Sequence, residues 1–202
     1  MKKYHTLSVV GLYIFGMSIA ATPAFAHLDP TEHGSFASGF THPVFGLDHV
    51  LAMIAVGLWA ALIGGRTIWI LPSAFVGFMI FGFASSLADM SVPFVEPVIL
   101  CSVVVLGALV ALAARLPLLP SAILVGAFGF FHGYAHGGEI GIAGELGYAV
   151  GFILATALLH AAGLMIGYGA KVGLDPETRH GELATRFLGG MTALCGLVLM
   201  AG

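Results

Sequence analysis

Six apolar stretches constrain this chain more than any other feature, because each is close to the length of about 20 residues that a helix needs to cross a bilayer. They lie at about 43–63, 67–88, 94–114, 118–138, 146–168 and 184–201. A bilayer interior has no water to hydrogen-bond backbone N–H and C=O groups, so each stretch must satisfy its own groups as a helix. Only 8% of the 202 residues are charged, compared with about 25% in soluble domains. The sequence therefore predicts an all-α, polytopic membrane protein with six transmembrane helices.

The first 26 residues have the three parts of a secretory signal peptide. Lys2 and Lys3 give a positive start, an apolar run follows, and Ala24-Phe25-Ala26 forms a small-x-small cleavage site. We expect a cleaved signal peptide at 1–26, a periplasmic N-terminal arm at 27–42 and a six-helix transmembrane domain at 43–202. The alternative is that residues 1–26 stay attached as an uncleaved first helix.

Cleavage after Ala26 would make His27 the N-terminal residue. Its α-amine and imidazole could then chelate a metal ion together, with Asp29, Glu32 and His33 close behind. His27 and His33 are therefore candidate metal ligands. The alternative is a short solvated arm without a binding role.

Basic side chains indicate the orientation of the helices. The five that lie in or beside the first, third and fifth connections are Arg66, Arg115, Lys171, Arg179 and Arg186. The second and fourth connections contain acidic residues and no Lys or Arg. Since Lys and Arg are enriched in cytoplasmic loops, the odd connections are predicted to be cytoplasmic and both mature termini periplasmic.

A stripe of ligating side chains lies in the segment Phe131-His132-Gly133-Tyr134-Ala135-His136-Gly137-Gly138-Glu139. On a helix, His136 lies about 40° from His132, and Glu139 lies about 20° to the other side of His132. Imidazoles at positions i and i+4 can share one divalent cation. Glycines at 129, 133 and 137 form a second stripe that lets another helix approach closely. The segment is a candidate metal site; the alternative is that both His residues only hydrogen-bond between helices.

A second group of polar residues lies at the start of the first apolar stretch. The helix of this stretch is predicted to begin at Pro43, because a proline at the first helical position loses no hydrogen bond through its missing N–H. His42 and His49 lie on one face of a helix but about 10.5 Å apart along its axis, and Met53 continues that face. This spacing suits successive ion positions better than one shared site, unless Gly46 breaks the helix. All three side chains are candidate metal-binding groups.

The predicted topology places the polar residues in one layer. Those in the outer halves of their helices are His42, Asp48, His49, Glu96, His132, His136 and Glu139. Asp48 points about 100° away from His49 on a helix, so it is expected either to orient the imidazole of a partner or to form an Asp–His pair that locks two helices. His160, with Thr156 one turn before it, lies deeper in the fifth stretch. It is a candidate for a deeper station on an ion path, or a packed, hydrogen-bonded core residue.

Two of these segments resemble the signatures of the HupE/UreJ family. His42-Pro43-Val44-Phe45-Gly46-Leu47-Asp48-His49, followed by Met53 and Gly57, is similar to HPxxGxDHxxxMxxxG. The segment 131–139 is similar to that family's second motif, HGxAHGxE, and Pro93-Phe94-Val95-Glu96 resembles its acidic third-helix entry. With the signal peptide and the helix count, the resemblance covers essentially the whole chain.

The resemblance implies a permease of the bacterial inner membrane that moves Ni²⁺ or Co²⁺ from periplasm to cytoplasm. It also implies metal-handling roles for His42, Asp48, His49, Glu96, His132, His136 and Glu139. Tyr134 stands where some relatives have a further His, which leaves the coordination number open. Imidazole and carboxylate ligands suit nickel, cobalt and zinc, so Zn²⁺ can occupy the same site. No cofactor is expected to be permanently bound.

The chain contains no Walker motif, so we expect a facilitator or a gradient-driven transporter rather than an enzyme. The competing classes are an intramembrane zinc hydrolase, a haem protein with axial ligands such as His49 and His132, and a metal sensor or partner-binding subunit. No basic cluster indicates nucleic acid, and Cys101 and Cys195 are expected to be small core residues. The expected partners are the metal ion and the lipid bilayer; a homo-oligomer and metal-acceptor proteins stay open.

Overall fold

Helices account for all the regular structure in the part of the chain that the computed structural model describes, residues 36–137, 145–173 and 179–202. In chain order they are α2 (Phe36–Phe45), α3 (Leu47–Ile63), α4 (Thr67–Leu87), α5 (Val95–Ala111), α6 (Leu118–Gly137), α7 (Glu145–Gly173) and α8 (His180–Ala201). The all-α prediction is confirmed for these residues. The predicted signal peptide, residues 27–35 of the arm, Glu139 and part of the last loop lie outside the described ranges.

Four helices, α4, α6, α7 and α8, are long and apolar enough to cross a membrane. Helices α2 and α3 pass the same test together, so this bent pair raises the number of candidate spans to five. Helix α5 has 17 residues; at 1.5 Å per residue it is about 25 Å long, somewhat less than the hydrocarbon thickness of about 30 Å. The described helices support a multi-pass membrane protein, and a sixth span would require α5 to cross.

The first predicted span differs from a single helix that begins at Pro43. Helix α2 already includes Phe36, ends at Phe45 and is followed after Gly46 by α3. Pro43 lies in the last turn of α2 rather than at the first helical position. The helix extends further upstream because its small residues pack on α7: a Cβ added at Gly39 would lie 2.1 Å from the Tyr148 carbonyl oxygen. Tertiary packing therefore supports a helix where the sequence indicated an arm.

Glycine stripes set the distances between helices. The backbones of α4 and α6 run in parallel and meet at the stripe of glycines 129, 133 and 137, as predicted; a Cβ at Gly133 would lie 1.8 Å from the Met79 carbonyl oxygen. Helices α3 and α7 approach in the same way, since a Cβ at Gly57 would lie 2.3 Å from the His160 carbonyl oxygen. Such contacts bring backbones together where lipid supplies no hydrophobic driving force between helices.

Helix α3 is the centre of the bundle. Nearly every residue from Leu51 to Ala61 is buried, and α3 contacts α2, α4, α5, α7 and α8. Trp59, Phe75 and Phe152, from α3, α4 and α7, are the three largest side chains that are fully buried. His49, near the N-terminal end of α3, is therefore surrounded by other helices rather than by lipid.

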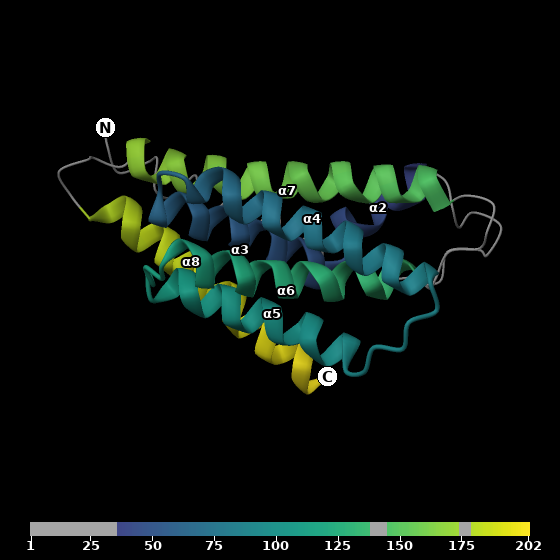
Figure 1. Ribbon diagram of the computed structural model, residues 1–202. Coiled ribbons are helices and arrows are strands. Elements are labelled where there is room, and N and C mark those ends of the chain that lie inside the picture. Colours follow the sequence, from purple (N-terminus) through teal and green to yellow (C-terminus); the bar gives the residue numbers. More distant parts are fainter. Residues whose placement is uncertain (1–35, 138–144, 174–178) are drawn as a thin grey trace.

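The basic residues gather at one end of the bundle, which in Figure 1 is the end where α3, α5 and α7 finish and α4, α6 and α8 begin. Two hydrogen bonds tie this end together: Trp59 Nε1 donates to the Ala114 carbonyl (2.8 Å), and Arg186 Nε donates to the Ala111 carbonyl (2.8 Å). The first turns of α2, α3 and α5 and the last turns of α4 and α6 lie toward the opposite end. The structure thus separates the basic connections from the half of the bundle that contains the candidate site.

Candidate metal centre

A break at Gly46 brings two imidazoles together that a straight helix would hold apart. Gly46 has extended backbone angles (φ −74°, ψ 111°), and the axes of α2 and α3 are bent by 78° at this point. The ring centroids of His42 and His49 are consequently 5.3 Å apart. A straight helix would separate them by about 10.5 Å along its axis. The sequence allowed one shared site only if Gly46 broke the helix, and the structure has this break and brings the two imidazoles together.

Gly46 also leaves room for this geometry. A Cβ at this position would lie 2.9 Å from His49 Nδ1 and 3.3 Å from both Asp48 Oδ1 and the His42 carbonyl oxygen. Any side chain would therefore press on the residues that form the site. The chain still hydrogen-bonds across the break, because Gly46 N donates to the His42 carbonyl and Val50 N to the Gly46 carbonyl, each at 2.9 Å.

Helix α6 contributes the third imidazole. His136 Nε2 lies 2.7 Å from His49 Nε2, and the His136 ring centroid is 4.3 Å from that of His42. One ring nitrogen from each of His42, His49 and His136 lies within 4.8 Å of the other two. His49 and His136 are buried and His42 is half-buried. We call these three side chains the three-imidazole group.

Asp48 lies against its neighbour His49. Asp48 Oδ1 is 2.9 Å from His49 Nδ1, a distance of ion pairing, although the ring N–H is not aligned for a hydrogen bond. A carboxylate at this nitrogen favours the tautomer with its hydrogen on Nδ1, which turns the lone pair of Nε2 toward the other imidazoles. The sequence predicted that Asp48 orients the imidazole of a partner, whereas in the structure it lies against His49 of its own helix.

His132, one turn before His136, stands beside the group rather than in it. Its Nδ1 donates to the Phe128 carbonyl (2.8 Å), so the lone pair is on Nε2. Nε2 is buried and has no hydrogen-bond partner among the described residues. The His132 ring centroid is 5.2 Å from that of His49.

Aromatic side chains of α7 cover the group. The Phe152 ring centroid lies 5.0 Å from that of His136 and 6.1 Å from that of His49, and Tyr148 lies 6.4 Å from His42. Sequence reasoning missed these two residues. The signal available in the sequence was their spacing of four residues on an apolar helix, which puts both rings on one face.

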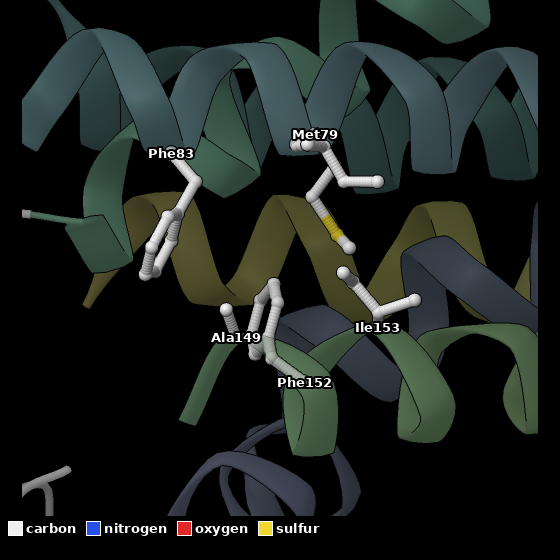
Figure 2. Close-up of a pocket in the computed structure, with 6 residues that line it drawn as sticks. Met79, Phe83, Ala149, Phe152 and Ile153 are labelled. Atoms are coloured by element: carbon white, nitrogen blue, oxygen red, sulfur yellow. The ribbon is translucent and has the colours of Figure 1, made fainter. Parts of the chain in front are cut away.

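Phe152 also lines a small cavity of about 30 Å³ between α4 and α7. The residues around it are Met79, Ile80, Phe83, Ala149, Phe152 and Ile153. Figure 2 shows the side chains of Met79 and Phe83 pointing toward those of α7. This cavity has only apolar side chains in its wall.

The other predicted site residues lie elsewhere. Glu96 is exposed in the first turn of α5, outside the three-imidazole group. Met53 is fully buried in the apolar core, and His160 is buried in α7.

Tyr134, at the position where some relatives have His, contacts the Met90 carbonyl and accepts a hydrogen bond from Val92 N (3.2 Å). Its hydroxyl therefore holds the connection between α4 and α5. His27, His33 and Glu139 lie outside the described residues.

Three imidazoles at this spacing can bind a divalent transition metal. Metal–nitrogen bonds of about 2.0–2.1 Å place two ligands of a tetrahedral site about 3.3 Å apart. The 2.7 Å contact between His49 and His136 must lengthen by about 0.6 Å to admit an ion. The hydrogen between these nitrogens must also move to the other nitrogen of its ring, because a ligating nitrogen needs its lone pair. The soft thiolate ligands that favour Cu⁺ are absent from the group.

Comparison with known proteins supports the resemblance of the two motifs. The family model described as HupE / UreJ protein matches residues 15–199. "Protein HupE" from Rhizobium leguminosarum bv. viciae is 39% identical over 189 residues, which cover 92% of this chain and 95% of that protein. No solved structure matches the chain significantly. A match over nearly the whole length at this identity shows that the chain belongs to the HupE/UreJ family.

Proposed function

We propose that this protein is a secondary membrane transporter, a permease that moves Ni²⁺ or Co²⁺ from the periplasm to the cytoplasm of a bacterium. The observation that carries the proposal is the three-imidazole group, built from three helices inside a bundle whose outer surface is largely apolar. Polar and ionisable residues within membrane helices are rare because they are costly, and they commonly mark ion pathways. Membership of the HupE/UreJ family agrees with this role.

The ligands present suit a carrier. Three neutral imidazoles with Asp48 nearby bind borderline divalent cations such as Ni²⁺, Co²⁺ and Zn²⁺. A carrier must also release its ion, which a closed cage of four protein ligands would hinder. A group with open coordination positions meets this need, and Glu139 and the predicted N-terminal arm are proposed to supply further ligands on the outer side.

An intramembrane zinc hydrolase is the second candidate, because three His ligands and an open position also suit catalytic zinc. A hydrolase must hold a substrate beside the metal and polarise its scissile bond. The cavity beside Phe152 measures only about 30 Å³ and has an apolar wall. This cavity is too small for a lipid-sized substrate and has no polar group to polarise a scissile bond, so it does not favour the hydrolase.

The proposed orientation has both mature termini in the periplasm and six spans, with α5 as the short third span. The grouping of basic residues at the end of the bundle away from the three-imidazole group supports it. A reporter active only in the periplasm, fused after Gly202, is expected to be active. Activity of a cytoplasmic reporter at this position would contradict the orientation.

The proposed function predicts metal uptake by the purified full chain in proteoliposomes. Radioactive nickel or cobalt is expected to accumulate with saturable kinetics, above the level in protein-free liposomes. A pH gradient of either sign, imposed in parallel samples, tests whether protons are coupled to the ion. Failure of correctly folded protein to move either metal would contradict the proposal, and hydrolysis of a reporter ester without transport would favour the second candidate.

A further inference from the structure

His160 is a fully buried imidazole in the middle of α7. Only 1% of its surface is exposed, and neither ring nitrogen has a hydrogen-bond partner within the described ranges. Buried polar atoms in native proteins are hydrogen-bonded in the great majority of cases, so two unpartnered nitrogens on one ring require an explanation. A neutral imidazole always has one nitrogen with a free lone pair, which is the group that binds a metal cation.

A series of rings leads from the three-imidazole group to His160. The His132 ring lies 5.2 Å from the ring of His49 and 5.3 Å from that of Phe75. Phe75 in turn meets His160 edge to face, with centroids 5.0 Å apart. These four rings come from α3, α6, α4 and α7. His160 therefore follows His132 on the way into the bundle, with the aromatic ring of Phe75 between them.

Two further donor atoms lie beside this position. Thr156 precedes His160 by one turn of α7, so both side chains lie on the same face of the helix. Its hydroxyl donates to Met79 Sδ at 3.6 Å, and all three side chains are buried. Hydroxyl and thioether groups are neutral ligands and weaker than imidazole for nickel and cobalt. Together with one imidazole they would hold a divalent ion more loosely than the three-imidazole group does.

We propose that His160, with Thr156 and Met79, forms an inner binding station for the divalent transition-metal ion after it leaves the three-imidazole group. The inference rests on the proposed transport function and adds a second, weaker site to it. Phe75 lies between the two sites, and the face of its ring attracts cations. Two sites of unequal strength in series allow capture at the first and release from the second.

The two sites are separable by measuring binding and transport on the same purified variants. His160→Ala leaves the three-imidazole group intact, so the Kd of the first cobalt ion should stay within about twofold of the parent's. The initial uptake rate in proteoliposomes should fall about tenfold or more, because the ion loses its inner ligand. His160→Gln keeps the size of the side chain without the imidazole and should show the same split.

A second measurement detects the inner site without transport. In a His42→Ala/His49→Ala background only one imidazole of the outer group remains, and the remaining weak cobalt binding, followed by visible absorption, should belong to the inner site. Adding His160→Ala should remove this binding. Adding Leu159→Ala, which deletes a side chain of similar size at the adjacent, partly buried position, should leave it unchanged.

The outcomes distinguish the inference from the function on which it rests. Parental uptake rates in both His160→Ala and His160→Gln, or residual cobalt binding that survives His160→Ala in the His42→Ala/His49→Ala background, would overturn the inner station. Absence of transport by the parent protein would instead overturn the proposed function, and the absorption measurement would still decide whether His160 binds metal.

Discussion

His136→Ala protein is expected to bind nickel and cobalt roughly 100-fold more weakly than the parent and to lose detectable uptake. The substitution removes the one imidazole that α6 adds to the pair formed by α2 and α3. It also leaves His49 Nε2 without its 2.7 Å contact inside a buried site. Two imidazoles that remain on one bent helix pair cannot surround an ion from both sides. Isothermal titration of the purified protein, beside radiotracer uptake, measures both effects.

A matched control separates this loss from general damage. His180 is exposed at the first residue of α8, at the end of the bundle away from the three-imidazole group. His180→Ala should bind and transport like the parent while the same type of side chain is lost. If well-folded His136→Ala protein binds both metals as tightly as the parent does, the three-imidazole group is not the metal site.

Sequence patterns predicted the helical elements and the face on which the His residues of α6 lie. The period of 3.6 residues fixes which side chains share a face, so His132, His136 and the glycine stripe followed from positions alone. The stripe then predicted a close helix contact, and the structure supplies its partner, the backbone of α4 from Phe75 to Phe83. Local rules were sufficient for these features because each depends on one helix.

The sequence could not predict the three-imidazole group, because the group depends on features that short-range sequence patterns do not determine. A glycine inside an apolar helix is compatible with both a continuous helix and a break, and only a break lets His42 meet His49. Whether His132 or His136 of α6 joins these two imidazoles depends on how α6 lies relative to α3. The sequence pattern of α6 alone therefore could not show which of the two is in the group. The extension of α2 upstream of Pro43 likewise depends on contacts with α7 that no local signal reports.

The glycine stripe predicts a pair of substitutions with opposite effects on stability. Gly133→Ala would place a Cβ 1.8 Å from the Met79 carbonyl oxygen and 2.6 Å from its carbonyl carbon, so the backbones of α4 and α6 must move apart. Overpacking against a backbone that cannot yield should cost about 3 kcal/mol of unfolding free energy. The shift would also displace Met79 and the neighbouring His132, so metal binding should weaken together with stability.

Gly77→Ala is the matched control for this pair. Gly77 lies in α4, and a Cβ at that position would meet nothing within 4 Å. Because alanine favours a helix over glycine by up to about 1 kcal/mol, this variant should be as stable as the parent or slightly more stable. Thermal unfolding in detergent, followed by circular dichroism, compares the two variants at equal protein concentration. Equal midpoints for Gly133→Ala and Gly77→Ala would mean that α4 and α6 do not meet at this stripe, and the position of His132 and His136 relative to α3 would then lose its support.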